Sequence, residues 1–179
     1  MHKAKHLELL KEIQRETHGF TEFVPLSFVH NEAPMYFNDT IPKVRPGPSG
    51  NEVMKMHAVS RIMLNGYINN IQVSWVKEGA RMSQVLLGAG ANDFGGTLIN
   101  ESISTAAGAQ YGQLMKPMHI HSIIREAGRI PVQRTTLYKP IRDFGIETQE
   151  CESSLDKADP REFGSYHELI KLDKFKFKT

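Results

Sequence analysis

The sequence has only one cysteine, Cys151, among its 179 residues. A single thiol excludes an internal disulfide bond and is typical of proteins in a reducing cytoplasm, which is the localisation we expect. The sequence also lacks any apolar run close to the roughly 18 residues that a membrane-spanning helix needs. Its first residues, MHKAKHLELLKEIQ, do not have the pattern of a signal peptide. We therefore expect neither a disulfide scaffold nor a membrane protein.

A strong charge imbalance is missing as well. The chain has 22 Lys and Arg residues against 20 Asp and Glu residues, which gives a formal net charge of +2. A dedicated nucleic-acid-binding protein would show a basic stripe, so we expect no nucleic-acid partner. The one basic cluster is the tail KLDKFKFKT, which we interpret as a solvated chain end rather than a binding site.

The familiar short motifs are absent too. Residues 88–90, GAG, begin like the dinucleotide-binding GxGxxG fingerprint, but they follow a predicted helix, and Asp93 stands where the third glycine should be. There is no phosphate-binding Walker loop, and no Cys or His group has the spacing of a zinc site. His119 and His121 are two residues apart in a predicted helix, so they point to different faces and are interpreted as surface histidines.

What the sequence does contain is an alternation of helical and extended segments. Apolar periodicity and turn residues predict strands over residues 20–29, 70–76, 91–96 and 132–138. Helices are predicted over residues 2–19, 51–67, 80–90, 98–109 and 116–129, with Asn51 and either Thr97 or Asn100 as N-caps. This order favours an α/β fold with a parallel sheet covered by helices. Four strands are too few to close a barrel, so we expect part of something larger.

Polar residues gather where two of these strands end. In NIQVSWV, alternation places Ile71, Val73 and Trp75 on one face of the strand, and Gln72, Ser74 and Val76 on the other. Polar side chains fit a helix-covered face poorly, so Gln72 and Ser74 are expected to face the interior of a barrel. They would line either a ligand pocket or a hydrogen-bonded polar core layer, and the pattern leaves both open.

The stretch GANDFGGTLINESIST presents the same alternatives. Asn92 and Asp93 are predicted to end a short parallel strand with their side chains towards the interior. Gly95 and Gly96 are predicted to form a tight passage into a helix that begins near Thr97. Free N–H groups at that helix start would face the same place. The rival interpretation is a structural turn, in which the Asp93 carboxylate accepts hydrogen bonds from neighbouring backbone amides.

Five segments resemble the C-terminal half of the radical SAM enzymes that make the deazaflavin chromophore FO. In chain order they are FTEFVPLSFVH, MHAVSRIML, NIQVSWVKEG, GANDFGGTLINESIS and PVQRTTLY. The resemblance covers residues 2–138 and is nearest to the tyrosine-using family CofH, also called FO synthase subunit 2. Related enzymes of the futalosine route to menaquinone share versions of NIQ.SW and GANDFG and are the alternative. The runs EFVPLSFVH and GGTLINESIS favour the FO enzymes.

The resemblance implies a fold and a division of the chain. Residues 1–140 would form the second half of a TIM-type (β/α) barrel of a radical SAM enzyme, with roughly four parallel strands and covering helices. Residues 141–179 would be a C-terminal extension that is partly helical or disordered. The half that precedes this one in the family is absent from the sequence, so we expect an N-terminal barrel half to be the main partner.

The resemblance also implies a reaction. In this family a 4Fe-4S cluster on a CxxxCxxC motif reduces S-adenosylmethionine, and the resulting radical attacks L-tyrosine. The hydroxybenzyl fragment is transferred to 5-amino-6-ribitylaminouracil, and a partner FO synthase subunit, CofG, closes the deazaflavin ring. One cysteine cannot provide three thiolates, so this chain is not expected to ligate the cluster. We expect the isolated chain to be inactive.

The candidate site residues are expected to bind the substrates or S-adenosylmethionine, while catalytic residues stay unknown and no metal ligand is expected in this chain. Arg134 is interpreted either as a pocket cation or as a member of an ion pair. The full set is Ser27, His30, Gln72, Ser74, Trp75, Asn92, Asp93, Thr97, Glu101 and Arg134. Two other functions stay open: a non-catalytic ligand-binding module, and an assembly fragment that binds no ligand.

Overall fold

The computed structural model describes residues 2–38, 40–146, 153–169 and 171–175. The longer helices are α1 (His2–Thr17), α3 (Gly50–Leu64), α4 (Trp75–Gly88) and α6 (Pro117–Glu126). The short ones are α2 (Pro34–Phe37), α5 (Ser102–Ala106), α7 (Ser154–Lys157) and α8 (Tyr166–Leu169). Two 3-10 turns lie at Pro160–Phe163 and Asp173–Phe175, and the strands are β1 (Val132–Arg134) and β2 (Pro140–Asp143). Cys151 and residues 176–179 of the lysine-rich tail lie outside the described residues.

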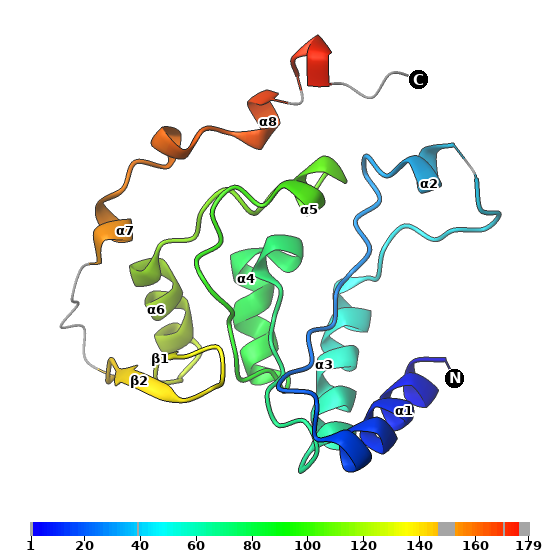
Figure 1. Cartoon of the computed structure of the whole chain (residues 1–179), viewed down its shortest axis with the longest axis vertical. Coiled ribbons are helices and arrows are strands. Elements are labelled where there is room, and N and C mark those ends of the chain that lie inside the picture. The colour runs from blue at the N-terminus through cyan, green and yellow to red at the C-terminus, as the bar shows by residue number, and fades with distance from the viewer. Residues whose placement is uncertain (1, 39, 147–152, 170, 176–179) are drawn as a thin grey trace.

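The four longer helices stand in a row in the order α1, α3, α4 and α6, and each contacts the next (Figure 1). Three extended segments run parallel to one another: one follows α1, one precedes α4 and one follows α4. Single parallel bridges pair Phe23 with Ile71 and Gln72 with Asp93. Backbone hydrogen bonds join Gln72 N to Phe23 O at 3.0 Å and Val73 N to Asp93 O at 2.9 Å. Three segments that the sequence predicts as strands are therefore neighbours, although each contact is only one bridge long.

The fourth predicted strand, residues 132–138, takes a different partner. Only its first three residues are extended, as β1, which pairs antiparallel with β2. A turn joins the two strands, with Tyr138 in the left-handed region at φ 60°. Within the described residues the regular sheet consists of these two strands.

A capping box marks the start of helix α3. The Ser49 side chain accepts a hydrogen bond from Glu52 N, and the Glu52 carboxylate accepts one from Ser49 N at 2.9 Å. Together these bonds satisfy two of the amides that a helix start leaves unpaired. The predicted N-cap, Asn51, is therefore wrong: it lies inside the helix, two residues after Ser49.

The two helices around the GANDFGG stretch begin in different ways. Helix α4 starts at Trp75, but a kink at Gly79, where φ is +76°, divides it, and the part after the kink starts at residue 80 as predicted. A Cβ at Gly79 would lie 2.6 Å from the Tyr111 ring, so this position needs glycine both for its backbone and for space. Helix α5 begins at Ser102 because the Glu101 carboxylate accepts hydrogen bonds from its first amides. Neither Thr97 nor Asn100 caps it.

The apolar core lies between the parallel segments and the helix row. Ile71, Val73 and Trp75 are 0%, 1% and 3% exposed, so the predicted burial of that face is confirmed. The largest cluster joins the last two of them to side chains of α3, α4 and α6. Val76, predicted on the other face, is also buried in the same cluster, because helix α4 begins at Trp75 and the alternation ends there. A smaller cluster packs α1 on α3 through Leu7 and Leu64. The helix-covered side of the segments is therefore apolar.

The C-terminal segment runs along the edge of the molecule past α6 and α5 (Figure 1). The Asp156 carboxylate accepts a hydrogen bond from Met118 N at 2.9 Å, in the first turn of α6. Asn100 donates to Phe163 O at 3.0 Å and accepts from Tyr166 N at 3.1 Å. The described part of the extension is thus tied to the rest of the chain. No helix among the described residues is long and apolar enough to cross a membrane.

Candidate functional site

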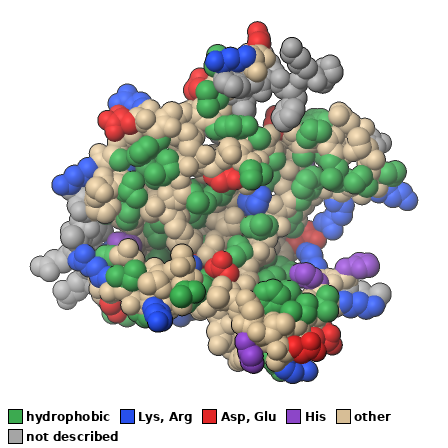
Figure 2. All heavy atoms as spheres, in the orientation of Figure 1, with side chains coloured by type: hydrophobic (Ala, Val, Ile, Leu, Met, Phe, Trp, Pro, Cys, Tyr) green, Lys and Arg blue, Asp and Glu red, His purple; other side chains and the backbone are tan. Residues whose placement is uncertain are grey.

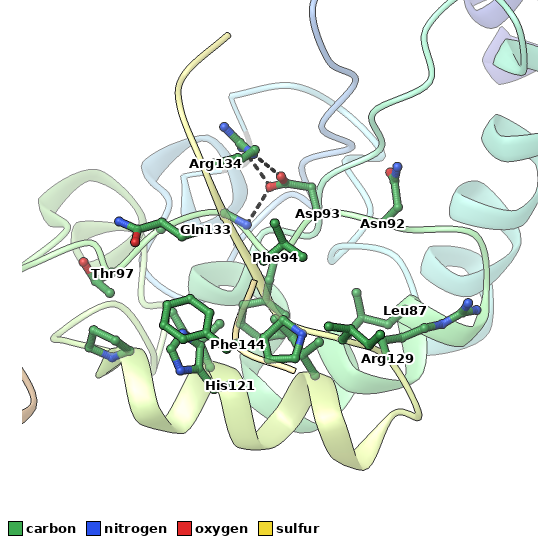
Figure 3. Close-up of a pocket in the computed structure, with 18 of the residues that line it drawn as sticks. Leu87, Asn92, Asp93, Phe94, Thr97, His121, Arg129, Gln133, Arg134 and Phe144 are labelled. Atoms are coloured by element: carbon green, nitrogen blue, oxygen red, sulfur yellow. Dashed lines mark hydrogen bonds and ion pairs between the residues drawn. The ribbon is translucent and has the colours of Figure 1, made fainter. Parts of the chain in front are cut away.

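The parallel segments have a polar side opposite the helices. Ile71 and Val73 are buried on the helix side, so Gln72 between them points to the other, open side. Phe94 is likewise buried in the helix-side cluster, and its neighbour Asp93 points away from it (Figure 3). A hydrogen bond of 2.9 Å from Gln72 Nε2 to Asp93 Oδ1 joins the two polar side chains. The open side is therefore where the site is built.

The Asp93 carboxylate is surrounded by donors. Besides Gln72, its Oδ1 accepts from Gly95 N at 2.8 Å and from Arg134 Nη2 at 3.0 Å, and its Oδ2 accepts from Arg134 Nε (Figure 3). The Asp93 side chain is 9% exposed and that of Arg134 is 25% exposed. The hydrogen bond to Asp93 is the main cause that raises the pKa of Arg134 above its usual range. Asp93 thus bonds a nearby backbone amide and also forms a two-bond ion pair.

Two further residues, which the sequence did not single out, join this arrangement. Glu22 Oε2 accepts a hydrogen bond from Gln72 Nε2 at 3.1 Å and another from the Tyr138 hydroxyl. Arg134 Nη2 lies 3.8 Å from Glu22 Oε2, and the guanidinium carbon lies 3.8 Å from the centroid of the Tyr138 ring. We call these five residues, Glu22, Gln72, Asp93, Arg134 and Tyr138, the polar network.

The Tyr138 hydroxyl is held as a donor. Burial is the largest cause that raises its pKa above the usual value, and the hydrogen bond to Glu22 is the second. A raised pKa keeps the phenol protonated near neutral pH, so its O–H donates to the carboxylate. Glu22 therefore receives two donors on one oxygen, from Gln72 and from Tyr138.

The Asn92 side chain lies on the opposite side from Asp93, which differs from the expectation that both face the interior. Its Oδ1 accepts from Arg61 Nη2 at 2.7 Å and from Ile71 N at 2.8 Å, and its Nδ2 donates to Asn69 O at 3.1 Å. Consecutive residues of an extended segment point to opposite faces, so the two side chains cannot both turn inward. Asn92 ties the segment to α3 through Arg61.

Three other candidates have structural contacts. Trp75 is buried in the main apolar cluster, and its Nε1 donates to Gly96 O at 2.8 Å. Ser74 is the N-cap residue of α4, although its side chain makes no capping hydrogen bond. Glu101 accepts from Ser104 N at 2.8 Å as the cap of α5. These contacts hold the fold around the polar network and leave Trp75 no exposed ring face on which a ligand could stack.

A cavity of about 1150 Å³ opens beside the polar network, between α6 and β1 (Figure 3). Asn92, Asp93, Thr97 and Arg134 line it, so it collects four of the ten candidates. The rest of its lining mixes apolar side chains with three arginines, Arg61, Arg129 and Arg142. It includes Phe144, whose ring lies 4.0 Å from that of His121, centroid to centroid. His121 is therefore half-buried rather than a plain surface histidine, whereas His119 is exposed.

Ser27 and His30 line a second, smaller cavity of about 260 Å³. The Ser27 hydroxyl donates to the Glu78 carboxylate, and the His30 ring packs edge-on against Tyr36 at a centroid distance of 5.0 Å. The structure therefore separates these two candidates from the polar network. Among the described residues there is no group of three or more His, Cys, Asp and Glu side chains that could hold a metal ion.

Comparison with known proteins gives a family match over most of the chain. The model of a family described as the CofH/MqnC C-terminal region matches residues 17–146. All five residues of the polar network fall inside that range.

Individual relatives match over nearly the same length. A 5-amino-6-(D-ribitylamino)uracil–L-tyrosine 4-hydroxyphenyl transferase of Methanocaldococcus jannaschii is 55% identical over 138 residues, which is 77% of this chain and 38% of the relative. The protein of the same description from Methanopyrus kandleri is 53% identical over 139 residues, 78% of this chain and 37% of the relative. The chain thus spans less than two fifths of the length of these curated relatives.

Proposed function

Because the chain belongs to the CofH/MqnC C-terminal region family, we propose that it forms part of a radical SAM transferase acting on L-tyrosine. In the proposed reaction the hydroxybenzyl part of tyrosine is joined to 5-amino-6-ribitylaminouracil, on the route to FO, the precursor of coenzyme F-420. The two substrates come from the activity named for relatives that are 55% and 53% identical to this chain. The role of this chain is to build one wall of the substrate site.

The proposed fold is the second half of a (β/α) barrel with the polar network on its interior face. Parallel extended segments with helices on one side are the arrangement of a barrel wall. The face seen in Figure 2 carries many apolar side chains. Across the molecule, large apolar side chains such as Leu26 and Leu137 are 65% and 70% exposed. Exposed apolar surface of this kind is typical of a buried interface. In the proposed enzyme the remaining length of the protein covers it.

The polar network is the observation that carries this proposal. Its members come from all four segments that the sequence predicts as strands: Glu22, Gln72, Asp93, and the pair Arg134 and Tyr138. In a barrel, inward side chains from neighbouring strands meet in one layer, and the site lies at the strand ends. The network fixes the rotamers of its charged groups through hydrogen bonds, which is how an enzyme holds a substrate in one orientation.

The cofactors belong to the proposed whole enzyme. A 4Fe-4S cluster needs three thiolates, and this chain has one cysteine, so its residues do not fit the cluster and we assign no step through it to them. S-adenosylmethionine and the cluster would meet the substrates across the site from this wall. What the chain supplies is binding, orientation and exclusion of water. The CofG subunit would act on the product.

A chimera tests the proposal. Residues 2–140 of this chain replace the matched region of the M. jannaschii relative, and the reconstituted protein is given reductant, S-adenosylmethionine, L-tyrosine and the aminouracil. We expect a tyrosine-dependent product that contains both substrates, detected by mass spectrometry. The unmodified relative is the positive control.

The outcome that contradicts the proposal is a chimera with full cluster content and the native helix signal that makes no such product. If the chimera instead cleaves S-adenosylmethionine only with a substrate of the menaquinone route, the FO assignment is wrong and that route takes its place.

A further inference from the structure

The carboxylate that the sequence singled out, Asp93, has little capacity left for a ligand. Its two oxygens accept four hydrogen bonds, from Gln72, Gly95 and Arg134. The Arg134 guanidinium neutralises its charge in a two-bond pair, the geometry that fits a carboxylate best. Its side chain is 9% exposed. Asp93 is therefore a residue that positions its neighbours.

Glu22 is in the opposite situation. Both of its hydrogen bonds, from Gln72 and from Tyr138, go to Oε2. No hydrogen bond within the described residues reaches Oε1, and the side chain is 37% exposed. A carboxylate has about four lone-pair sites, so Oε1 is an open acceptor on a charged group.

Gln72 places a second open acceptor beside it. Its Nε2 donates both of its hydrogens, one to Glu22 Oε2 and one to Asp93 Oδ1. These bonds fix the amide so that the carbonyl oxygen, Oε1, is the end without a partner in the described part of the chain. Gly95, with φ at +79°, faces this oxygen, and a Cβ there would lie 3.3 Å from it. The absence of a side chain at Gly95 keeps the approach to the Gln72 oxygen open.

The charges of the polar network leave an excess of one negative charge. It contains two carboxylates, Glu22 and Asp93, and one cation, Arg134, while Tyr138 is protonated. Arg134 makes its hydrogen bonds to Asp93 and meets Glu22 only in a looser ion pair at 3.8 Å, so the excess negative charge is concentrated at Glu22. Open acceptors with negative charge are complementary to a group that only donates. An alkylammonium, with three donors and no acceptor, is such a group.

We propose that Glu22 and Gln72 bind a protonated primary amine, with Glu22 Oε1 and Gln72 Oε1 as its acceptors. The identification of that amine as the α-ammonium of tyrosine rests on the proposed function. Asp93, Arg134 and Tyr138 are positioning residues: they hold Gln72 and Glu22 in the geometry that leaves these two oxygens free. The site selects amines over carboxylates, because a carboxylate in the same place would face a charge of its own sign.

Two phenols of similar size test the inference on the 179-residue chain. Tyramine carries an ammonium and no carboxylate, and 3-(4-hydroxyphenyl)propionate carries a carboxylate and no ammonium. Each is titrated at pH 7 into isotope-labelled protein, with the Gly95 backbone amide and the Gln72 side-chain amide as reporters. We expect tyramine to bind at least tenfold more tightly, a preference of about 1.4 kcal/mol.

Three variants locate that preference. Glu22→Gln keeps the size and removes the charge, so the ratio of the two affinities should fall to about twofold or less. Glu22→Asp keeps the charge on a shorter side chain and should retain part of the preference. Glu16→Gln, on the exposed face of α1, is the matched control and should leave the ratio unchanged. Circular dichroism of each variant shows whether its fold is intact.

The possible failures can be told apart. Equal binding of the two phenols, or an unchanged ratio in a folded Glu22→Gln variant, overturns the amine site while the proposed function stands. If neither phenol shifts the signal of any amide of the chain, the amine site is overturned. The proposed function is then contradicted too, because it requires this chain to form a wall of the tyrosine site.

Discussion

Removing the charge of Asp93 should destabilise the chain more than removing the same charge elsewhere. In Asp93→Asn, Arg134 loses both of its bonds to a carboxylate at a position where its side chain is only 25% exposed. The amide can still accept from Gly95 N and Gln72, so the shape of the turn should be kept. The effect to be measured is therefore that of the ion pair.

The magnitude follows from the geometry. Two unit charges 3.0 Å apart attract by about 5.5 kcal/mol at an effective dielectric constant of about 20, and desolvation cancels much of this. Hydrogen bonds to charged groups contribute about 1.5–3 kcal/mol in mutational series. We expect Asp93→Asn to lower the free energy of unfolding by about 2 kcal/mol. In a chain of this length that corresponds to a fall in Tm of about 4–8 °C.

The chain offers its own reporter and its own control. Trp75 is the single tryptophan and is 3% exposed, so its fluorescence follows unfolding of the core beside the network. Asp159 forms a similar pair with Arg161, at 2.6 Å, but those side chains are 38% and 89% exposed. Asp159→Asn should therefore lower the free energy of unfolding by less than about 0.5 kcal/mol. A double-mutant cycle of Asp93→Asn with Arg134→Gln should give a coupling above about 1 kcal/mol. Equal costs at Asp93 and Asp159, or a coupling near zero, would show that the ion pair of Asp93 and Arg134 does not stabilise the fold.

Three further changes have predicted outcomes. Ser49→Ala should cost about 1 kcal/mol in urea unfolding because it removes the capping box, while Asn51→Ala, the control, should be nearly neutral; a larger cost at Asn51 would contradict this. Burial lowers the pKa of His57 below its usual value of 6.5, so near that pH the unfolded chain takes up a proton more readily than the folded chain. Stability should then fall as the pH drops below about 6.5, by up to about 1.4 kcal/mol per pH unit, and His57→Leu should flatten the slope; an unchanged slope would show that His57 does not cause it. Gly79→Ala should lower the unfolding free energy by about 1–3 kcal/mol, since a Cβ there meets the Tyr111 ring and φ is +76°; a wild-type melting curve would contradict the kink.

Strictly local sequence patterns predicted which face of a strand is buried. Alternation in NIQVSWV identified the buried face of Ile71, Val73 and Trp75, because burial follows directly from side-chain direction. Helix starts were harder, since the competing caps Ser49, Asn51, Thr97 and Glu101 all have side chains that can accept a hydrogen bond. Which of them caps depends on the path by which the chain enters the helix.

The candidate site was predicted only in part, for a physical reason. Gln72 and Asp93 were found because polar side chains in an extended segment fit a helix-covered face poorly, whereas Arg134 came from the resemblance to the family. Glu22 and Tyr138 were missed because they meet across 116 positions of sequence, and a glutamate or tyrosine in a polar stretch gives no signal by itself. Their role comes from the segments that bring them together.

A crystal structure of the chimera with L-tyrosine bound would show directly whether the open side of the parallel segments, with the polar network, is the wall of the tyrosine site. We expect the tyrosine ammonium about 3 Å from Glu22 Oε1 and Gln72 Oε1, with Asp93 still paired to Arg134. Tyrosine bound in the cavity beside Ser27 and His30, with the polar network facing only solvent, would contradict that expectation.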